Sequence, residues 1–170
     1  MDKKITFQGN ALTLSGDNVE VGQKAPVFQA TSQSLEAVTL DNFKGKVKVI
    51  NTFPSLDTPV CDLQVKEFNQ RASELSDDIA IIGISKDLPF AQKRFCDANK
   101  IEKSVVVSDY KDSSFGLGYG ALIKELNLLA RGVFIIDQNN VIKYKQLAGE
   151  ITNALNYDEA FEKLNEITRS

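Results

Sequence analysis

Two short runs of β-branched and apolar residues, each followed by a segment with helical spacing, limit the folds open to this chain. Residues 47–53 (VKVINTF) and residues 79–84 (IAIIGI) have the composition of strands buried on both faces. Apolar side chains then recur at three-to-four spacing over residues 59–75 and again over residues 88–98. Successive strand–helix units of this kind predict a sheet with helices packed on its faces.

The spacing within the two helical segments predicts which side chains face the core. Arg71 of the first helix is expected to lie on a solvated face. The stripe of that helix at three-to-four spacing consists of Val60, Leu63, Gln64, Phe68, Ala72 and Leu75. In the second helix the stripe that begins at Leu88 and includes Phe95 is expected to face inward. Cys96 then lies about 100° from that stripe, at a flank where it can be reached.

Turn signals divide the remaining chain into hairpins and a closing helix. Residues 5–14 alternate around Gln-Gly-Asn, and residues 131–144 contain two apolar runs around Gln-Asn-Asn, so each region predicts a hairpin. Residues 105–107 read as a short strand, and residues 122–129 as a partly helical apolar stretch. Asn156, with Glu159 three residues later, forms a capping-box pattern for a final helix through Ile167.

Together these elements predict one α/β domain over residues 1–170. We expect a thioredoxin-like fold, with a central mixed β-sheet flanked by helices and an N-terminal β-hairpin. Because one fold of this class hosts many activities, the function has to be argued from particular residues.

The absence of histidine excludes several kinds of site. The chain has 170 residues, two cysteines and no histidine, so it cannot contain a Cys-His or Ser-His-Asp hydrolase site or a His-ligated zinc. A net charge of -3 argues against a nucleic-acid or anionic-membrane surface. No apolar run has the length of a membrane span or of a signal peptide. We therefore expect a cytoplasmic protein in which the cysteines serve redox chemistry or catalysis.

The most informative segment is residues 53–61 (FPSLDTPVC), which leads into the first helix. Thr58 suits the N-cap and Pro59 the first helical position, so Cys61 falls in the first turn, where free backbone N–H groups favour a thiolate. Lowering the pKa of a thiol also lowers the nucleophilicity of its thiolate. A fast enzyme therefore needs further hydrogen-bond donors, or a cation, to stabilise the leaving group. Asp57 and Asp62 are expected to point to solvent. The alternative is that Cys61 is a small buried apolar residue.

Three segments carry a resemblance to a known family. Pro54, Thr58 and Cys61 match the P-x-x-x-T-x-x-C signature of the peroxiredoxins. Residues 85–96 (SKDLPFAQKRFC) resemble the resolving-cysteine segment of the bacterial thiol peroxidases, an atypical two-cysteine branch of that family. Residues 128–134 (LLARGVF) resemble the segment that supplies the active-site arginine. The similarity extends over nearly the whole chain.

The resemblance implies a role for each matching residue. Cys61 would be the peroxidatic nucleophile, and Cys96 the resolving thiol that forms an intramolecular disulfide with it. Thr58 would hydrogen-bond the sulfur and the bound peroxide, Pro54 would shield the pocket, and Arg131 would be the required cation. The resemblance further implies that hydrogen peroxide and alkyl or lipid hydroperoxides are reduced to water or alcohols. It implies thioredoxin as the reductant, a homodimer, and no metal, haem or flavin cofactor.

Two other functions stay open at this point. A thioredoxin-like redox or binding scaffold would keep the two cysteines as a static disulfide or as buried thiols. A disulfide oxidoreductase acting on proteins would normally hold its cysteines in a C-x-x-C motif, whereas 34 residues lie between Cys61 and Cys96. The presence of Thr58 before Cys61, with an arginine at 131, favours the peroxidase.

Overall fold

The computed structural model describes residues 3–169, and the strands in this part of the chain form two sheets. The larger sheet has the strand order β11-β10-β5-β6-β7-β3-β4. Its strands are β3 (Ala30–Thr31), β4 (Ala37–Val38), β5 (Val47–Thr52), β6 (Ile79–Ser85), β7 (Val105–Ser108), β10 (Gly132–Ile136) and β11 (Ile142–Leu147). The pairs β5–β6 and β6–β7 are parallel and the others antiparallel. The predicted mixed sheet is therefore confirmed.

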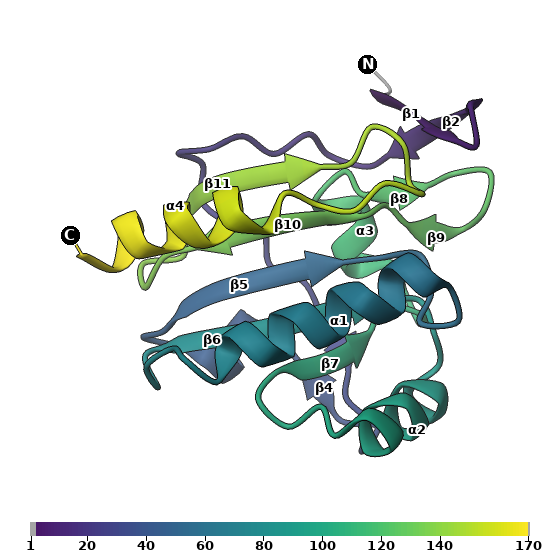
Figure 1. Ribbon diagram of the computed structural model, residues 1–170. Coiled ribbons are helices and arrows are strands. Elements are labelled where there is room, and N and C mark those ends of the chain that lie inside the picture. The colour runs from purple at the N-terminus through teal and green to yellow at the C-terminus, as the bar shows by residue number, and fades with distance from the viewer. Residues whose placement is uncertain (1–2, 170) are drawn as a thin grey trace.

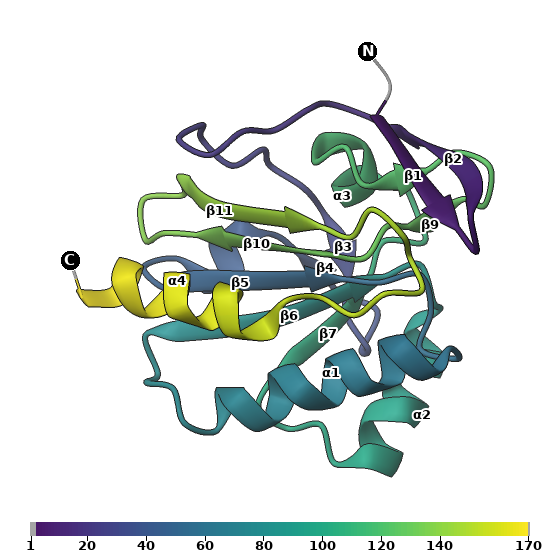
Figure 2. The same ribbon diagram turned by 45° about the horizontal axis from the view of Figure 1, so that its top comes forward.

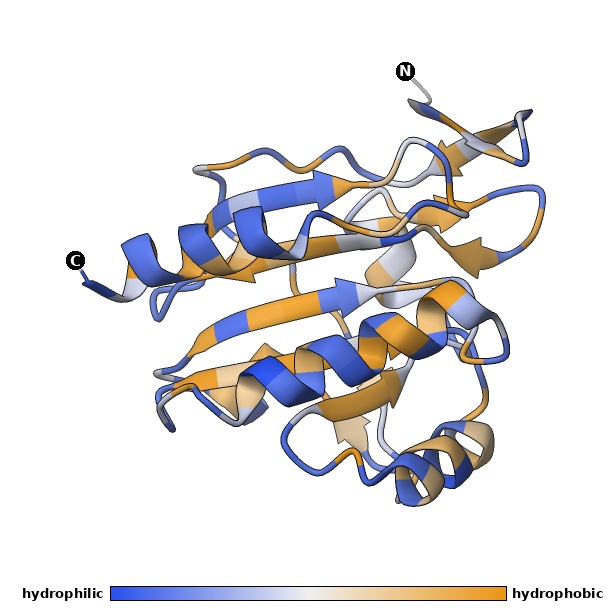
Figure 3. Ribbon diagram, viewed as in Figure 1, coloured by the Kyte–Doolittle hydropathy of each residue, from blue (hydrophilic) through white to orange (hydrophobic). Residues whose placement is uncertain are grey.

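Helices cover both faces of this sheet. Helices α1 (Pro59–Ala72) and α4 (Tyr157–Arg169) lie on one face, and α2 (Pro89–Asn99) lies beside β7 (Figures 1 and 2). The short helices η1 (Leu40–Phe43) and α3 (Ser114–Gly118) pack on the opposite side. Figure 3 shows why the strands occupy the centre: β6, β7 and β10 are mostly apolar, whereas the helices carry mixed polar and apolar faces.

The predicted N-terminal hairpin is also confirmed. It consists of β1 (Lys3–Phe7) and β2 (Asn10–Ser15), joined by a turn in which Gln8 and Gly9 have φ values of 52° and 83°. Two central residues with positive φ are typical of the two-residue type I′ turn, which matches the twist of an antiparallel pair. The hairpin forms the smaller sheet with two very short strands, in the order β1-β2-β8-β9.

The helical expectation for residues 122–129 is wrong. This segment forms β8 (Leu122–Ile123) and β9 (Leu128–Leu129), which pair with each other, and β8 extends the sheet of the N-terminal hairpin. The leucines whose spacing suggested a helix do not share one buried face, since Leu126 is exposed while Leu129 is buried. Pairing of β8 with the edge of β2 outweighs the local helical pattern.

The predicted inward faces of α1 and α2 are also partly wrong. In α1, Gln64 and Phe68 of the predicted stripe are buried together with Cys61 and Val65, whereas Leu63 is 64% exposed. In α2, Leu88 is exposed, and Cys96 is buried rather than at an accessible flank. Gln92, which was outside the predicted stripe, is completely buried, so a search for apolar spacing alone assigns the wrong face of α2.

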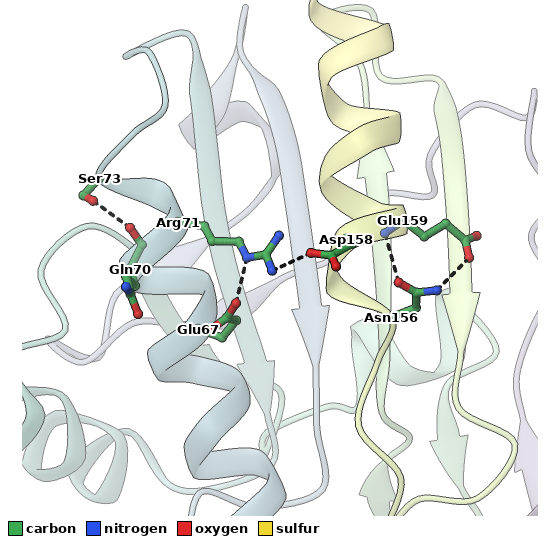
Figure 4. Close-up of polar contacts among 7 residues, drawn as sticks. All are labelled: Glu67, Gln70, Arg71, Ser73, Asn156, Asp158 and Glu159. Carbon is green, nitrogen blue, oxygen red and sulfur yellow. Dashed lines mark hydrogen bonds and ion pairs between the residues drawn. The ribbon is translucent and has the colours of Figure 1, made fainter.

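Arg71 lies on a partly exposed face and connects α1 to α4. Its Nε donates to Glu67 at 2.8 Å, and its Nη2 donates to Asp158 at 2.9 Å, at the start of α4 (Figure 4). The Asn156 side chain accepts from the Glu159 backbone N–H at 3.0 Å, as the predicted cap requires. These contacts fix the end of the segment that passes the candidate site just before α4.

Candidate active site

The peptide between β5 and α1 places Cys61 as the sequence predicts. Thr58 is the N-cap residue of α1 with extended backbone angles, and Pro59 occupies the first helical position. Cys61 is therefore in the first turn, at the carboxyl end of a parallel strand, and its side chain is completely buried. The helix start contributes unpaired N–H groups and the positive end of its dipole, both of which favour negative charge nearby.

Arg131 lies against the sulfur of Cys61. It directly precedes β10, the strand next to β5 in the sheet, and is 2% exposed. Its Nη2 donates to Cys61 Sγ at 3.3 Å. Within residues 3–169 no carboxylate forms an ion pair with this guanidinium. Burial of an unpaired positive charge is costly, so a negatively charged group next to this guanidinium would be stabilised.

Three further hydrogen bonds fix the Arg131 guanidinium. Its Nε and Nη2 donate to the Ile151 carbonyl at 3.1 and 2.8 Å, and its Nη1 donates to Gln64 Oε1 at 2.9 Å. Ile151 belongs to the segment between β11 and α4, so Arg131 joins three parts of the chain. A planar group held at each nitrogen cannot rotate away from the sulfur without breaking several bonds.

Gln64 is a site residue that the sequence reasoning missed. It is fully buried one turn after Cys61, and its Nε2 donates to Asn51 Oδ1 at 3.1 Å and to the Thr52 carbonyl at 3.0 Å. Its carbonyl oxygen is then fixed toward Arg131. The only sequence signal is a polar residue in the helix stripe that otherwise faces the sheet.

Gly132 has a specific packing reason to follow the arginine. A Cβ at this position would lie 2.6 Å from Leu147 Cδ2 and 2.8 Å from the Gln146 carbonyl oxygen in the neighbouring strand β11. Only glycine allows the two backbones this close approach. The register of β10, and with it the position of Arg131, depends on that approach.

A cavity of about 300 Å³ adjoins the arginine. Pro54, Thr58 and Arg131 line it together, so three of the five predicted site residues meet at one place. The rest of the lining is largely apolar and includes Phe7, Leu126, Leu128, Pro59, Val60 and Ile151. A mainly apolar cavity of this size with one buried cation fits a small molecule that has a polar end and an apolar body.

Thr58 does not donate a hydrogen bond to the sulfur of Cys61 in this structure. Its hydroxyl donates to the Ser55 carbonyl at 3.0 Å, and it makes no side-chain cap to the helix. Thr58 lines the cavity, and rotation of its hydroxyl would let it donate to another group. As the sequence predicts, Asp57 is exposed; Asp62 is only half-buried, and its carboxylate pairs with Lys66 at 2.6 Å.

Cys96 lies apart from this cavity, in the last part of α2. Both cysteines are free thiols, and both belong to one apolar cluster that also contains Phe53, Leu56 and Val65. Cys96 is 6% exposed, and its sulfur accepts a hydrogen bond of 3.4 Å from Gln33 Nε2. Burial raises the pKa of the Cys96 thiol, and the Gln33 hydrogen bond opposes that rise.

Neither a metal cluster nor a membrane span is found in residues 3–169. This part of the chain contains no group of three or more Cys, Asp or Glu side chains that could hold a metal ion. None of its helices is both long enough and apolar enough to cross a bilayer.

The chain is similar to known proteins over nearly its whole length. The family model described as Redoxin matches residues 20–163. The thiol peroxidase of Halalkalibacterium halodurans is 48% identical over 158 residues, which cover 93% of this chain and 95% of that protein. The thiol peroxidase of Bacillus subtilis is 47% identical over 159 residues, which cover 94% of this chain and 95% of that protein.

Solved structures agree with the fold predicted from sequence. The crystal structure of a peroxiredoxin-like protein from Aquifex aeolicus has a TM-score of 0.90 and 39% identity, and the match covers 96% of each chain. The structure of a thiol peroxidase from Chromobacterium violaceum has a TM-score of 0.86 and 20% identity, and the match covers 98% of this chain and 97% of that protein. These likenesses confirm the thioredoxin-like fold class.

Proposed function

We propose a catalytic cycle for this chain, which belongs to the Redoxin family and to the thiol peroxidases within it. The chain is a thiol-dependent peroxidase, and its nucleophile in the proposed cycle is Cys61. The observation that carries this assignment is the 3.3 Å hydrogen bond from Arg131 Nη2 to the Cys61 sulfur, in a site where both side chains are buried. It supports a thiolate held next to a fixed cation.

In the first step the Cys61 thiolate attacks the distal oxygen of the hydroperoxide. A sulfur–oxygen bond forms as the oxygen–oxygen bond breaks, which leaves a sulfenic acid and an alkoxide or hydroxide that takes up a proton. Arg131 stabilises the negative charge that moves from sulfur to the leaving oxygen. Because its guanidinium is already fixed by Ile151 and Gln64, little reorganisation is needed during the reaction.

The cavity residues bind and shield the peroxide in this proposal. The Thr58 hydroxyl turns from the Ser55 carbonyl to donate to the peroxide, and Pro54 keeps water from the reacting atoms. The apolar side chains that line the cavity, Phe7 and Ile151 among them, favour binding of alkyl or lipid hydroperoxides over hydrogen peroxide.

In the second step Cys96 closes the cycle. The Cys96 thiol loses its proton, and the thiolate attacks the sulfur of the Cys61 sulfenic acid. The sulfur–sulfur bond forms as the sulfur–oxygen bond breaks, and the departing hydroxide takes up a proton to become water. Since both sulfurs start buried in helices, α1 or α2 has to unwind locally for the bond to form. A dithiol reductant, which we propose is thioredoxin, then exchanges with the disulfide, regenerating both thiols as its own pair becomes oxidised.

Several broader properties follow as proposals from the family. We propose that the chain is one domain over residues 1–170 and works as a homodimer without a metal or organic cofactor. A cytoplasmic location fits a cycle that returns to two free thiols, because that compartment keeps thiols reduced. Light scattering during size-exclusion chromatography would measure the oligomeric state directly.

The test is peroxide consumption in the presence of thioredoxin and its reductase. Wild type is expected to turn over continuously, and Cys61→Ser to give only the uncatalysed rate. Cys96→Ser is expected to consume one equivalent and stop at a Cys61 sulfenic acid. If wild type and Cys61→Ser consume peroxide equally slowly, the chain is a scaffold with inert cysteines instead.

A further inference from the structure

Asp87 accepts hydrogen bonds from two separate parts of the chain. Its Oδ1 accepts from the Ser55 hydroxyl at 2.8 Å. Its Oδ2 accepts from the Leu56 backbone N–H at 2.9 Å and from the Ser85 hydroxyl at 2.7 Å. No lysine or arginine within residues 3–169 forms an ion pair with this carboxylate. Its charge is therefore held by hydrogen-bond donors, and such charge-assisted bonds are stronger than neutral ones.

On one side, these bonds set the shape of the loop that leads into Cys61. Ser55 donates its hydroxyl to Asp87, and that same oxygen accepts from the Asp57 backbone N–H at 3.2 Å. The Ser55 carbonyl accepts from the Thr58 hydroxyl at 3.0 Å and from the Thr58 backbone N–H at 3.2 Å. Because Pro54 directly precedes Ser55, Asp87 fixes the segment on which both Pro54 and Thr58 reach the cavity.

On the other side, Asp87 is tied to the start of α2, the helix of Cys96. The Ser85 hydroxyl that donates to Asp87 accepts from Gln92 Nε2 at 3.1 Å. Gln92 lies in the first turns of α2, is completely buried, and also donates to the Val107 carbonyl at 2.8 Å. Cys96 follows one turn later on the same buried face of the helix.

We propose that Asp87 is a positioning residue that couples the two cysteine segments, so that the loop before Cys61 and the start of α2 open together. This inference rests on the proposed function for its role in the cycle, although the coupling itself is a property of the folded chain. While Asp87 holds Ser55 and Leu56, the loop presents Thr58 and Pro54 to a peroxide. When the start of α1 unwinds, Asp87 loses those donors, and the segment that begins α2 loses an anchor at the same moment.

Coupling of this kind suits the order of the two chemical steps. The peroxide step needs the closed loop, whereas disulfide formation needs both sulfurs to leave their buried positions. Because both segments bond the same carboxylate, they open and close together as one cooperative unit with a closed and an open form. Loss of Asp87 should therefore slow the first step and ease the second.

Amide hydrogen exchange of the reduced protein tests the coupling without any peroxide. In Asp87→Asn we expect exchange to rise at least tenfold both at residues 56–61 and at residues 90–96, with β10 unchanged as the control for global folding. Asp57→Asn is the matched control, because it removes an exposed carboxylate from the same loop, and it should change neither segment. If Asp87→Asn does not fold, Ser55→Ala is used instead, and it should raise exchange in both segments by a smaller factor.

The two possible failures are distinguishable. Increased exchange in only one segment, or in neither, overturns the coupling whatever the catalytic result. Rapid-quench mass spectrometry adds a kinetic measurement of both steps. In Asp87→Asn, the sulfenic acid should form about tenfold more slowly than in wild type. Its conversion to the disulfide should be as fast as in wild type or faster. Equal slowing of both steps would mark a merely structural role. A wild type without peroxidase activity would instead refute the proposed function and leave the exchange test intact.

Discussion

The Nη2 atom of Arg131 lies 3.3 Å from the sulfur of Cys61, although 70 residues separate the two in sequence. The sheet creates this contact, because β10 and β5 are antiparallel neighbours and the arginine precedes one strand where the cysteine loop follows the other. The helix start at Cys61 is therefore complemented by a fixed cation. In the proposed cycle this pair activates the thiol in a chain that has no histidine.

Replacement of Arg131 should slow the peroxide step far more than it changes folding. Arg131→Lys keeps a positive charge but cannot bond Cys61, Gln64 and Ile151 together, so the rate of sulfenic acid formation should fall by about 10²- to 10³-fold. Rapid-mixing mass spectrometry measures that rate, and Arg94→Lys, at an exposed position of α2, is the control. An unchanged rate in Arg131→Lys would remove the arginine from the reaction.

Gln64→Glu should inhibit by competing with the thiolate. A carboxylate at this position would pair with Arg131 Nη1, which now donates to the amide oxygen, and would neutralise the charge that stabilises sulfur. We expect the peroxide step to slow by about tenfold, the size typical of one altered charged hydrogen bond. Gln64→Met, which removes the acceptor without adding a charge, should have a smaller kinetic effect. Equal rates for the two variants would contradict the competition.

Gly132→Ala should destabilise the protein and displace Arg131. The added methyl group would meet both the Leu147 side chain and the Gln146 carbonyl, so β10 and β11 must separate, at about 1–3 kcal/mol of unfolding free energy. Gly149→Ala is the matched control, because nothing lies within 4 Å of a Cβ there. Urea unfolding compares the two variants. Equal stability would show that the strands tolerate the separation.

The titration of Cys96 should reflect its burial and its contact with Gln33. In Cys61→Ser, which leaves one thiol, the ultraviolet absorbance of the thiolate should appear at a pH above the ordinary thiol pKa, because burial raises the pKa of Cys96. Gln33→Leu removes the opposing donor and should raise the midpoint further. A pKa raised in the folded state stabilises the fold below the ordinary thiol pKa, and that contribution is lost as pH rises through the folded pKa. A lower midpoint in Gln33→Leu would contradict the assignment.

Local patterns predicted most of the fold, because strand composition, turn residues and caps act over short distances. The strands β5, β6 and β10, both hairpins and the Asn156 cap were all evident from sequence. Residues 122–129 were not, since their strand pairing depends on β2, over 100 residues earlier. The face of α2 was misassigned for another reason: Gln92 is buried because it donates to partners that only the folded chain supplies.

The candidate site divides in the same way. Thr58, Pro59 and Cys61 follow a local rule for helix starts and could be placed without a structure. The role of Arg131 is implied only by resemblance to a family. The sequence does not show that Gln64 and the Ile151 carbonyl orient its guanidinium. Asp87 has no sequence signal of its own, because its significance lies in accepting bonds from Ser55 and Leu56 across a gap of about thirty residues.

The most direct test of the proposed cycle is the intact mass of the reduced chain before and after one equivalent of an alkyl hydroperoxide. Wild type should lose two hydrogens as Cys61 and Cys96 form a disulfide, Cys96→Ser should gain one oxygen at Cys61, and Cys61→Ser should not change. If Arg131→Lys loses two hydrogens as fast as wild type does, the proposed role of the arginine is contradicted. No mass change in wild type would contradict the cycle itself.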